Sequence, residues 1–171
     1  MHIKRLNLMR ITFAIALTLL TAGGIFYATK SFSSGTPSGI GYFKGNWIVT
    51  LKNNPKESFK WMVKDDLSGS WMVGVVEKDG EKVSTDFWRQ GSKKIERFAF
   101  TASGTFAKLE SPGWESDRLI LTGVASEKTG ETKIRETITR VNDRRFHALW
   151  EKESSDGKWI VFADEICIKS V

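Results

Sequence analysis

The amino-acid sequence predicts an all-β protein, a single antiparallel β-barrel of about ten strands preceded by one N-terminal apolar helix. Three observations lead to this expectation. From Ile40 onward, short segments in which polar and apolar residues alternate follow one another roughly every ten residues. Turns rich in Gly, Asn and Asp separate these segments, as in an antiparallel meander. No segment after Ile40 shows a long apolar pattern at helical spacing.

The N-terminus differs from the rest of the chain. Lys4, Arg5 and Arg10 precede the segment Ile11–Thr29, which contains no charged residue. A basic start followed by an apolar segment is typical of an export signal, and this segment is also long enough to remain as a membrane anchor. Two alternatives therefore stay open: a cleaved signal peptide, or a retained transmembrane helix. In both, the positive charge before the segment predicts that the domain lies outside the cytoplasm, in the periplasm or anchored to the inner membrane.

The chain is expected to have three parts. Residues 1–29 form the signal peptide or anchor. The segment Lys30–Gly39 is rich in Ser and Gly and contains Pro, which predicts a flexible linker. Residues 40–171 form the barrel domain. In this last part ten segments are expected as strands: Gly41–Lys52, Ser58–Val63, Gly69–Glu77, Glu81–Gln90, Lys94–Thr101, Gly104–Glu110, Arg118–Ser126, Thr132–Val141, Arg145–Glu153 and Lys158–Ile168.

The pattern Gly-x-Trp-Ile/Met-Val occurs at Gly45–Val49, Gly69–Val73 and Gly157–Val161. The spacing between the copies is irregular, which argues against a repeat architecture. We interpret the pattern as a way for a strand to begin. Gly lets the chain enter the strand tightly, and each Trp is expected to cover the end of the barrel.

Alternation favours a barrel over a β-sandwich. In the segment Thr132–Val141, Glu136 and Arg140 share a face with Ile134 and Ile138. A dry sandwich core rarely accommodates such charges, whereas a barrel with a partly wet lumen does. Two interpretations of Glu136 and Arg140 remain: a buried ion pair that fixes the register, or a polar anchor inside a ligand cavity.

Two stretches carry a family resemblance. The start Gly45-x-Trp47 resembles the entry motif of lipocalins and related calycins. The longer stretch Ser111–Lys169 contains Gly-Trp-x-x-Asp before a strand, Arg-Glu-Thr in the next strand and a Cys-x-Lys ending. It resembles an uncharacterised bacterial family with a lipocalin-like (calycin-type) β-barrel domain, over most of the chain after Gly41.

The resemblance implies a lipocalin-like barrel in which Trp47 packs across the closed end, beneath a basic residue from a late strand. The last predicted strand contains no Arg. We therefore expect Arg140 or Arg144 to take that place. The resemblance implies no activity.

The composition speaks against several function classes. Of the formal net charge of +6, three positive charges lie in the first ten residues, and the other basic residues are scattered, which argues against nucleic-acid binding. Apart from His2, the chain has one histidine, His147, which alternation places on the outer face, so neither a catalytic nor a haem-binding role is expected. The single cysteine, Cys167, is interpreted as a small buried apolar residue rather than a reactive thiol. No catalytic residue, metal site or cofactor is predicted.

We therefore predict an exported, non-enzymatic β-barrel that binds a small, mainly apolar ligand. Its candidate ligand contacts are Arg89, Glu136, Arg140 and Trp150. The alternative is a membrane-anchored accessory subunit of an inner-membrane protein complex, and an enzyme is the least favoured class. One group of aromatic residues is expected to be mostly core: Phe59, Trp61, Phe98, Phe100, Phe106, Phe146 and Trp150.

Overall fold

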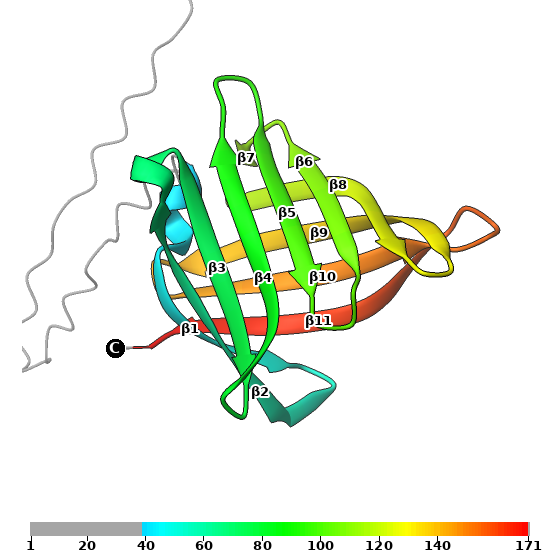
Figure 1. The fold of residues 1–171 in the computed structure, drawn as a ribbon, viewed down its shortest axis with the longest axis horizontal. Coiled ribbons are helices and arrows are strands. Elements are labelled where there is room, and N and C mark those ends of the chain that lie inside the picture. The colour runs from blue at the N-terminus through cyan, green and yellow to red at the C-terminus, as the bar shows by residue number, and fades with distance from the viewer. Residues whose placement is uncertain (1–38, 171) are drawn as a thin grey trace, which may run out of the picture. The chain divides into compact units, whose positions relative to one another are not determined.

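The structure, a computed structural model, describes residues 39–170 (Figure 1). In this range the chain forms strands and two short 3-10 helices, η1 (Ile40–Phe43) and η2 (Leu67–Gly69). The predicted N-terminal helix lies outside the described residues, as does the predicted linker apart from Gly39. Within the described range, no helix has both the length and the apolar character needed to span a membrane.

Within residues 39–170, eleven strands follow one another. Their bounds are β1 (Gly45–Leu51), β2 (Asn54–Asp66), β3 (Trp71–Lys78), β4 (Glu81–Gln90), β5 (Ile95–Thr101), β6 (Phe106–Ser111), β7 (Trp114–Glu115), β8 (Arg118–Glu127), β9 (Gly130–Asn142), β10 (Arg145–Glu153) and β11 (Trp159–Lys169).

The strands form one closed antiparallel barrel. Neighbours in sequence pair from β1 to β6 and from β8 to β11. Two further pairings, β1 with β11 and β6 with β8, close the sheet on itself (Figure 1). Closure leaves no edge with unpaired backbone groups among these ten strands. The short strand β7 pairs with the beginning of β8 and lies outside the ring of ten.

The ten predicted strand segments correspond to the ten barrel strands, and the predicted barrel is confirmed. Two details differ: the residues before Gly45, expected to extend the first strand, form η1, and the short strand β7 lies in none of the predicted segments. The backbone N–H of Ile40 donates to Oε1 of Gln90 at 3.0 Å, and the Nε1–H of Trp114 donates to the carbonyl of Gly39 at 3.2 Å. These contacts hold the segment against the end of the barrel instead of in the sheet.

Aromatic rings fill the end of the barrel next to η1. The centroid of the fully buried Phe43 ring lies 5.0 Å from that of Trp88 and 5.6 Å from that of Phe146. Trp47 packs beside it, and its Nε1–H donates to the carbonyl of Phe43 at 2.7 Å. Trp114 stacks on Phe43 with a centroid distance of 5.9 Å. This cluster closes one end of the barrel with packed apolar surface.

The basic residue over Trp47 is Lys169, not Arg140 or Arg144. Trp47 and Lys169 face each other in the β1–β11 ladder, and Nζ of Lys169 lies 5.2 Å from the centre of the Trp47 ring. The guanidinium of Arg140 instead lies 5.2 Å from the centre of the Tyr42 ring. Arg144 donates to the carbonyl of Lys169 at 3.3 Å. A lysine two residues beyond Cys167 therefore provides the contact expected of an arginine.

Only one of the three repeated tryptophans covers the barrel end. All three glycines have positive φ, at 116° for Gly45, 82° for Gly69 and 79° for Gly157, so their role at strand entry is confirmed. Trp71 and Trp159, however, are partly exposed, and their rings contact the guanidinium groups of Arg89 and Arg135. The expectation that they cover the end of the barrel was wrong, because the first residues of β3 and β11 place Trp71 and Trp159 on the outer face of the sheet.

The aromatic residues predicted as core divide between the two faces of the sheet. Three of them, in β5 and β6, alternate with lumen-facing residues and lie on the outer face. These are Phe98, Phe100 and Phe106. Phe100 is 47 % exposed and contacts Phe106 and Phe87, with centroid distances of 5.1 and 6.1 Å. They form an external aromatic ridge rather than part of the core.

The seam between β6 and β8 depends on a glycine. Gly123 faces Leu109 across this ladder, and a Cβ at position 123 would lie 1.8 Å from the carbonyl oxygen of Lys108. The atom in conflict belongs to the backbone, so it has little freedom to move. The two strands that close the barrel therefore approach more closely than a side chain at this position permits.

We expect Gly123→Ala to lower the free energy of unfolding by about 2 kcal/mol or more, because the added methyl forces the seam apart. Urea denaturation followed by tryptophan fluorescence measures this loss. Gly41→Ala is the matched control, since a Cβ there meets no atom within 4 Å. Equal stability of the two variants would show that the seam tolerates the methyl group.

Candidate functional site

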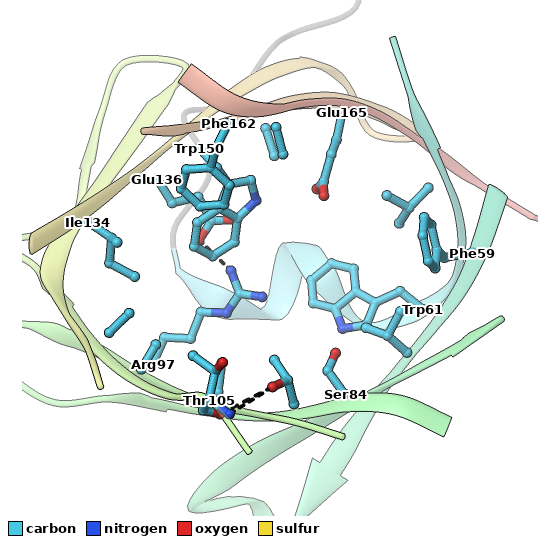
Figure 2. A pocket seen from close by; sticks show the side chains of 18 of the residues that line it. Phe59, Trp61, Ser84, Arg97, Thr105, Ile134, Glu136, Trp150, Phe162 and Glu165 are labelled. Carbon is cyan, nitrogen blue, oxygen red and sulfur yellow. Dashed lines mark hydrogen bonds and ion pairs between the residues drawn. The ribbon is translucent and has the colours of Figure 1, made fainter. Parts of the chain in front are cut away.

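A cavity of about 580 Å³ occupies the lumen. It extends from the aromatic cluster at the closed end to Glu127, Thr132 and Lys152, which lie near strand ends on the other side. Its wall combines aromatic rings with a set of small side chains: Ala99, Ala107, Ala125, Ala148 and Ala163. Figure 2 shows Phe59, Trp61, Trp150 and Phe162 around this space. The small residues leave the room, and the rings give the wall its apolar character.

An arginine crosses the floor of the cavity. Arg97 of β5 donates through Nε to Oδ2 of Asp86 on β4, at 3.0 Å, and ion-pairs through the guanidinium with Glu136 on β9. Asp86 is 2 % exposed and Glu136 is 3 % exposed. Buried charges require such pairing, so this bridge fixes three strands relative to one another.

Asp86 collects donors from three residues. Besides Arg97, it accepts hydrogen bonds from Nε1 of Trp88 at 2.7 Å and from Nε1 of Trp61 at 3.2 Å. Gly74 makes room for this group, because a Cβ there would lie 1.9 Å from Oδ1 of Asp86. A carboxylate with this many donors remains compatible with burial.

The guanidinium of Arg97 also lies close to two indole rings. Its central carbon is 4.6 Å from the centre of the Trp88 ring and 5.0 Å from that of Trp150. Burial disfavours the positive charge, but the carboxylates of Glu136 and Asp86 outweigh it and raise the pKa of Arg97 above its ordinary value. Arg97 is therefore a fixed cation, and each of its three guanidinium nitrogens has a protein carboxylate as partner.

Glu165 is a second carboxyl in the cavity wall. It lies on β11 opposite Ala148 of β10, and Figure 2 shows its side chain directed into the lumen. Burial raises the pKa of Glu165 from 4.5 to about 7, and the nearby charge of Glu136 adds to the effect. Arg97 and a hydrogen bond from Trp150 act in the opposite direction but do not cancel it. The carboxyl therefore titrates near neutral pH.

Two of the four candidate ligand contacts line this cavity. Glu136 and Trp150 face each other across the β9–β10 ladder, and both contribute to the wall. Arg89 is on the outer face, where it pairs with Glu96 and lies over Trp71. Arg140 is on the same face as Glu136 but at the closed end, where it pairs with Asp143.

The lumen partner of Glu136 is thus Arg97 rather than Arg140, so the predicted Glu136–Arg140 pair is wrong. Arg140 lies two residues farther along β9, next to the aromatic cluster, and its guanidinium reaches Tyr42. Alternation along β9 places Glu136 and Arg140 on one face. It does not show which strand across the barrel supplies the ion-pair partner of Glu136.

Sequence analysis did not single out Asp86, Arg97 or Glu165. In β4 and β5 the apolar residues Phe87 and Phe98 are on the outer face, so hydrophobic alternation pointed to the wrong side. A signal was nevertheless present: Gly74 lies opposite Asp86 in the ladder, and a strand glycine marks a close approach by another group.

Sequence analysis also considered His147 and Cys167 as functional residues. His147 alternates with the lumen-facing Phe146 and Ala148, so it lies on the outer face, as predicted. Cys167 is 2 % exposed and lines the base of the cavity, and burial raises the pKa of its thiol well above the ordinary value. The thiol is therefore not activated as a nucleophile, in agreement with the prediction of a buried apolar role.

The arrangement is suited to non-covalent binding. It provides apolar volume, aromatic faces and a carboxyl that titrates near neutrality. Within residues 39–170, no group of three or more His, Cys, Asp or Glu side chains converges in the way a metal ion requires.

The chain matches no protein-family model, and a search of curated proteins finds no match. The evidence for its class therefore comes from its own architecture. A closed antiparallel barrel with a packed end, Trp47 across that end and a lumen cavity is compatible with a lipocalin-like fold.

The raised pKa of Glu165 predicts a pH-dependent stability. Its folded pKa of about 7 exceeds the unfolded value near 4.5, so the native state binds the extra proton and stability falls as pH rises between these values. The loss by pH 8 is up to about 3 kcal/mol. In denaturation experiments at pH 5 and pH 8, Glu165→Gln should flatten this decline. Asp164→Asn, which removes a carboxyl outside the cavity, should retain it; an unchanged decline in Glu165→Gln would exclude Glu165 as its source.

Proposed function

We propose that this protein is an exported, non-enzymatic β-barrel that binds a small, mainly apolar ligand in its lumen. The observation that carries the proposal is the cavity of about 580 Å³, which lies within the size range of small-molecule sites. Most residues of its wall are aromatic or aliphatic, and a minority are polar or charged, as in many small-molecule sites. The basic N-terminus followed by the uncharged segment Ile11–Thr29 supports export.

Burial of apolar surface supplies the binding energy in this proposal. Phe59, Trp61, Trp150 and Phe162 present ring surface to the lumen. Each square ångström of apolar surface removed from water contributes roughly 25 cal/mol, so a ligand of two or three rings gains several kcal/mol. The barrel loses little conformational entropy on binding, because the cavity exists before the ligand arrives.

Binding of the neutral fluorescent probe phenylnaphthylamine to the full-length protein tests the proposal. We expect its emission to rise and to saturate with one probe per chain. Ala163→Trp places an indole in the cavity wall opposite Trp150 and should weaken binding by at least about tenfold. Val161→Trp adds similar bulk to the same strand on the outer face, opposite Glu151, at a residue that is 51 % exposed, and should leave binding unchanged.

This pair of variants separates the lumen from any other apolar part of the chain. A probe bound by the N-terminal apolar segment would respond to neither substitution. No saturable binding, or equal binding by Ala163→Trp and the parent protein, would contradict a site in the lumen.

The second candidate is an accessory subunit of an inner-membrane protein complex. Exposed apolar residues on β11 favour it: Ile160 and Val161 are 48 and 51 % exposed. Contiguous exposed apolar residues frequently mark a protein contact.

Native mass spectrometry of the protein extracted with mild detergent from its host distinguishes the two candidates. A barrel that retains a small additional mass supports the ligand-binding proposal. A barrel that retains protein partners, and loses them on Val161→Glu, supports the subunit proposal.

A further inference from the structure

The polar groups of the lumen do not balance in charge. The cavity wall includes the carboxyls of Glu127, Glu136 and Glu165, against the cations of Arg97 and Lys152. Asp86 pairs with Arg97 and adds a further carboxylate next to the cavity. With these groups ionised, carboxylates exceed cations in and beneath the cavity, so the lumen favours positive charge in a ligand.

The guanidinium in the cavity wall, that of Arg97, already has protein carboxylates as partners. Arg97 pairs with both Asp86 and Glu136, and its guanidinium also contacts the rings of Trp88 and Trp150. A ligand carboxylate placed here would have to displace one of these partners. The cavity floor is therefore poorly suited to an anionic ligand such as a fatty-acid carboxylate.

Glu165 has no such partner. Within residues 39–170, no lysine or arginine nitrogen lies within 4.0 Å of its carboxyl, although the carboxyl is directed into the cavity. The charged or titratable groups around it are Glu136 on β9, Arg97 on β5, and Asp164 and Cys167 on its own strand. Desolvation of this half-buried carboxyl favours its neutral form, and a cationic group bound beside it would favour the charged form instead.

The surroundings of Glu165 suit an ammonium group. Trp150 donates a hydrogen bond to it, and the rings of Trp61, Phe59 and Phe162 line the same cavity (Figure 2). Aromatic faces attract cations, most strongly where water is excluded. Carboxylate and aromatic faces together favour an ammonium over a neutral hydroxyl.

We propose that the ligand is an apolar, ring-containing amine whose ammonium nitrogen pairs with Glu165 while its rings occupy the aromatic part of the lumen. This inference rests on the proposed function and specifies the chemical class of the ligand. It assigns Glu165 the role of counter-ion within the lumen, whereas Glu127, the other wall carboxyl without a close cation among the described residues, is exposed at the end of β8.

Calorimetric titration of the full-length protein with three matched probes tests this inference. The probes are naphthylmethylamine, naphthalenemethanol and naphthoate, which share a ring system and differ in the charge of one group. At pH 8, we expect the amine to bind about tenfold more tightly than the alcohol, and the carboxylate to bind most weakly. Glu165→Gln should bring the ratio of amine to alcohol affinity close to one, because it keeps the shape and removes the charge.

Asp164→Asn is the matched control. It removes one negative charge from the adjacent position, where Asp164 pairs with Lys52 outside the cavity wall. The preference for the amine should persist in this variant. Loss of the preference in both variants would mean that the overall field selects the amine, and would overturn direct pairing with Glu165.

The outcomes also separate this inference from the proposed function. If the alcohol or the carboxylate binds as tightly as the amine, the amine inference is overturned while ligand binding stands. If none of the three probes binds but phenylnaphthylamine does, the amine inference is again overturned alone. If phenylnaphthylamine and all three probes fail to bind, the proposed function falls together with the inference.

Discussion

The bridge from Asp86 through Arg97 to Glu136 is the constraint on which the interior of the barrel depends. It joins β4, β5 and β9, and both carboxylates are almost completely buried. Loss of Arg97 would leave two buried carboxylates without a counter-charge, a change that costs several kcal/mol in comparable cases. Other residues accommodate this group of charges. The indoles of Trp61 and Trp88 donate hydrogen bonds to Asp86, and Gly74 leaves space for its carboxylate.

The two ends of the barrel therefore differ: one is closed by packed side chains, and the other contains the cavity. At the closed end, the side chains of Phe43, Trp47 and Trp88 are fully buried, and Nζ of Lys169 lies over the ring of Trp47. In the lumen beyond the bridge, several strands have alanine at positions that line the cavity. These small side chains leave the space that forms the cavity. The charged floor lies between the two regions and holds opposite walls of the barrel at a fixed separation, so the apolar packing below does not extend into the lumen.

Alternation and turn signals predicted the ten strands and the closed sheet, because period-two patterning and Gly-containing turns are local properties of the sequence. The same alternation placed Glu136 and Trp150 in the lumen. It could not identify Arg97, because β5 carries apolar residues on both faces and the aromatic ones, Phe98 and Phe100, are outside. Which inward charge meets which depends on the registers around the whole barrel, and these follow from closure rather than from any one strand.

The order of the strands around the barrel also bears on how the chain folds. Nearly every ladder joins strands that are adjacent in sequence, and hairpins of this kind form from local contacts. The β6–β8 ladder skips only the short β7, so the long-range exception is β1, whose second neighbour is β11. Trp47 therefore reaches Lys169 only after the rest of the chain has been synthesised. Until then one side of β1 presents unpaired N–H and C=O groups, and a second chain at the same stage presents an identical edge. The last strand therefore protects the first, and a chain shortened before Cys167 would be exposed to association through β1 even with every other hairpin in place.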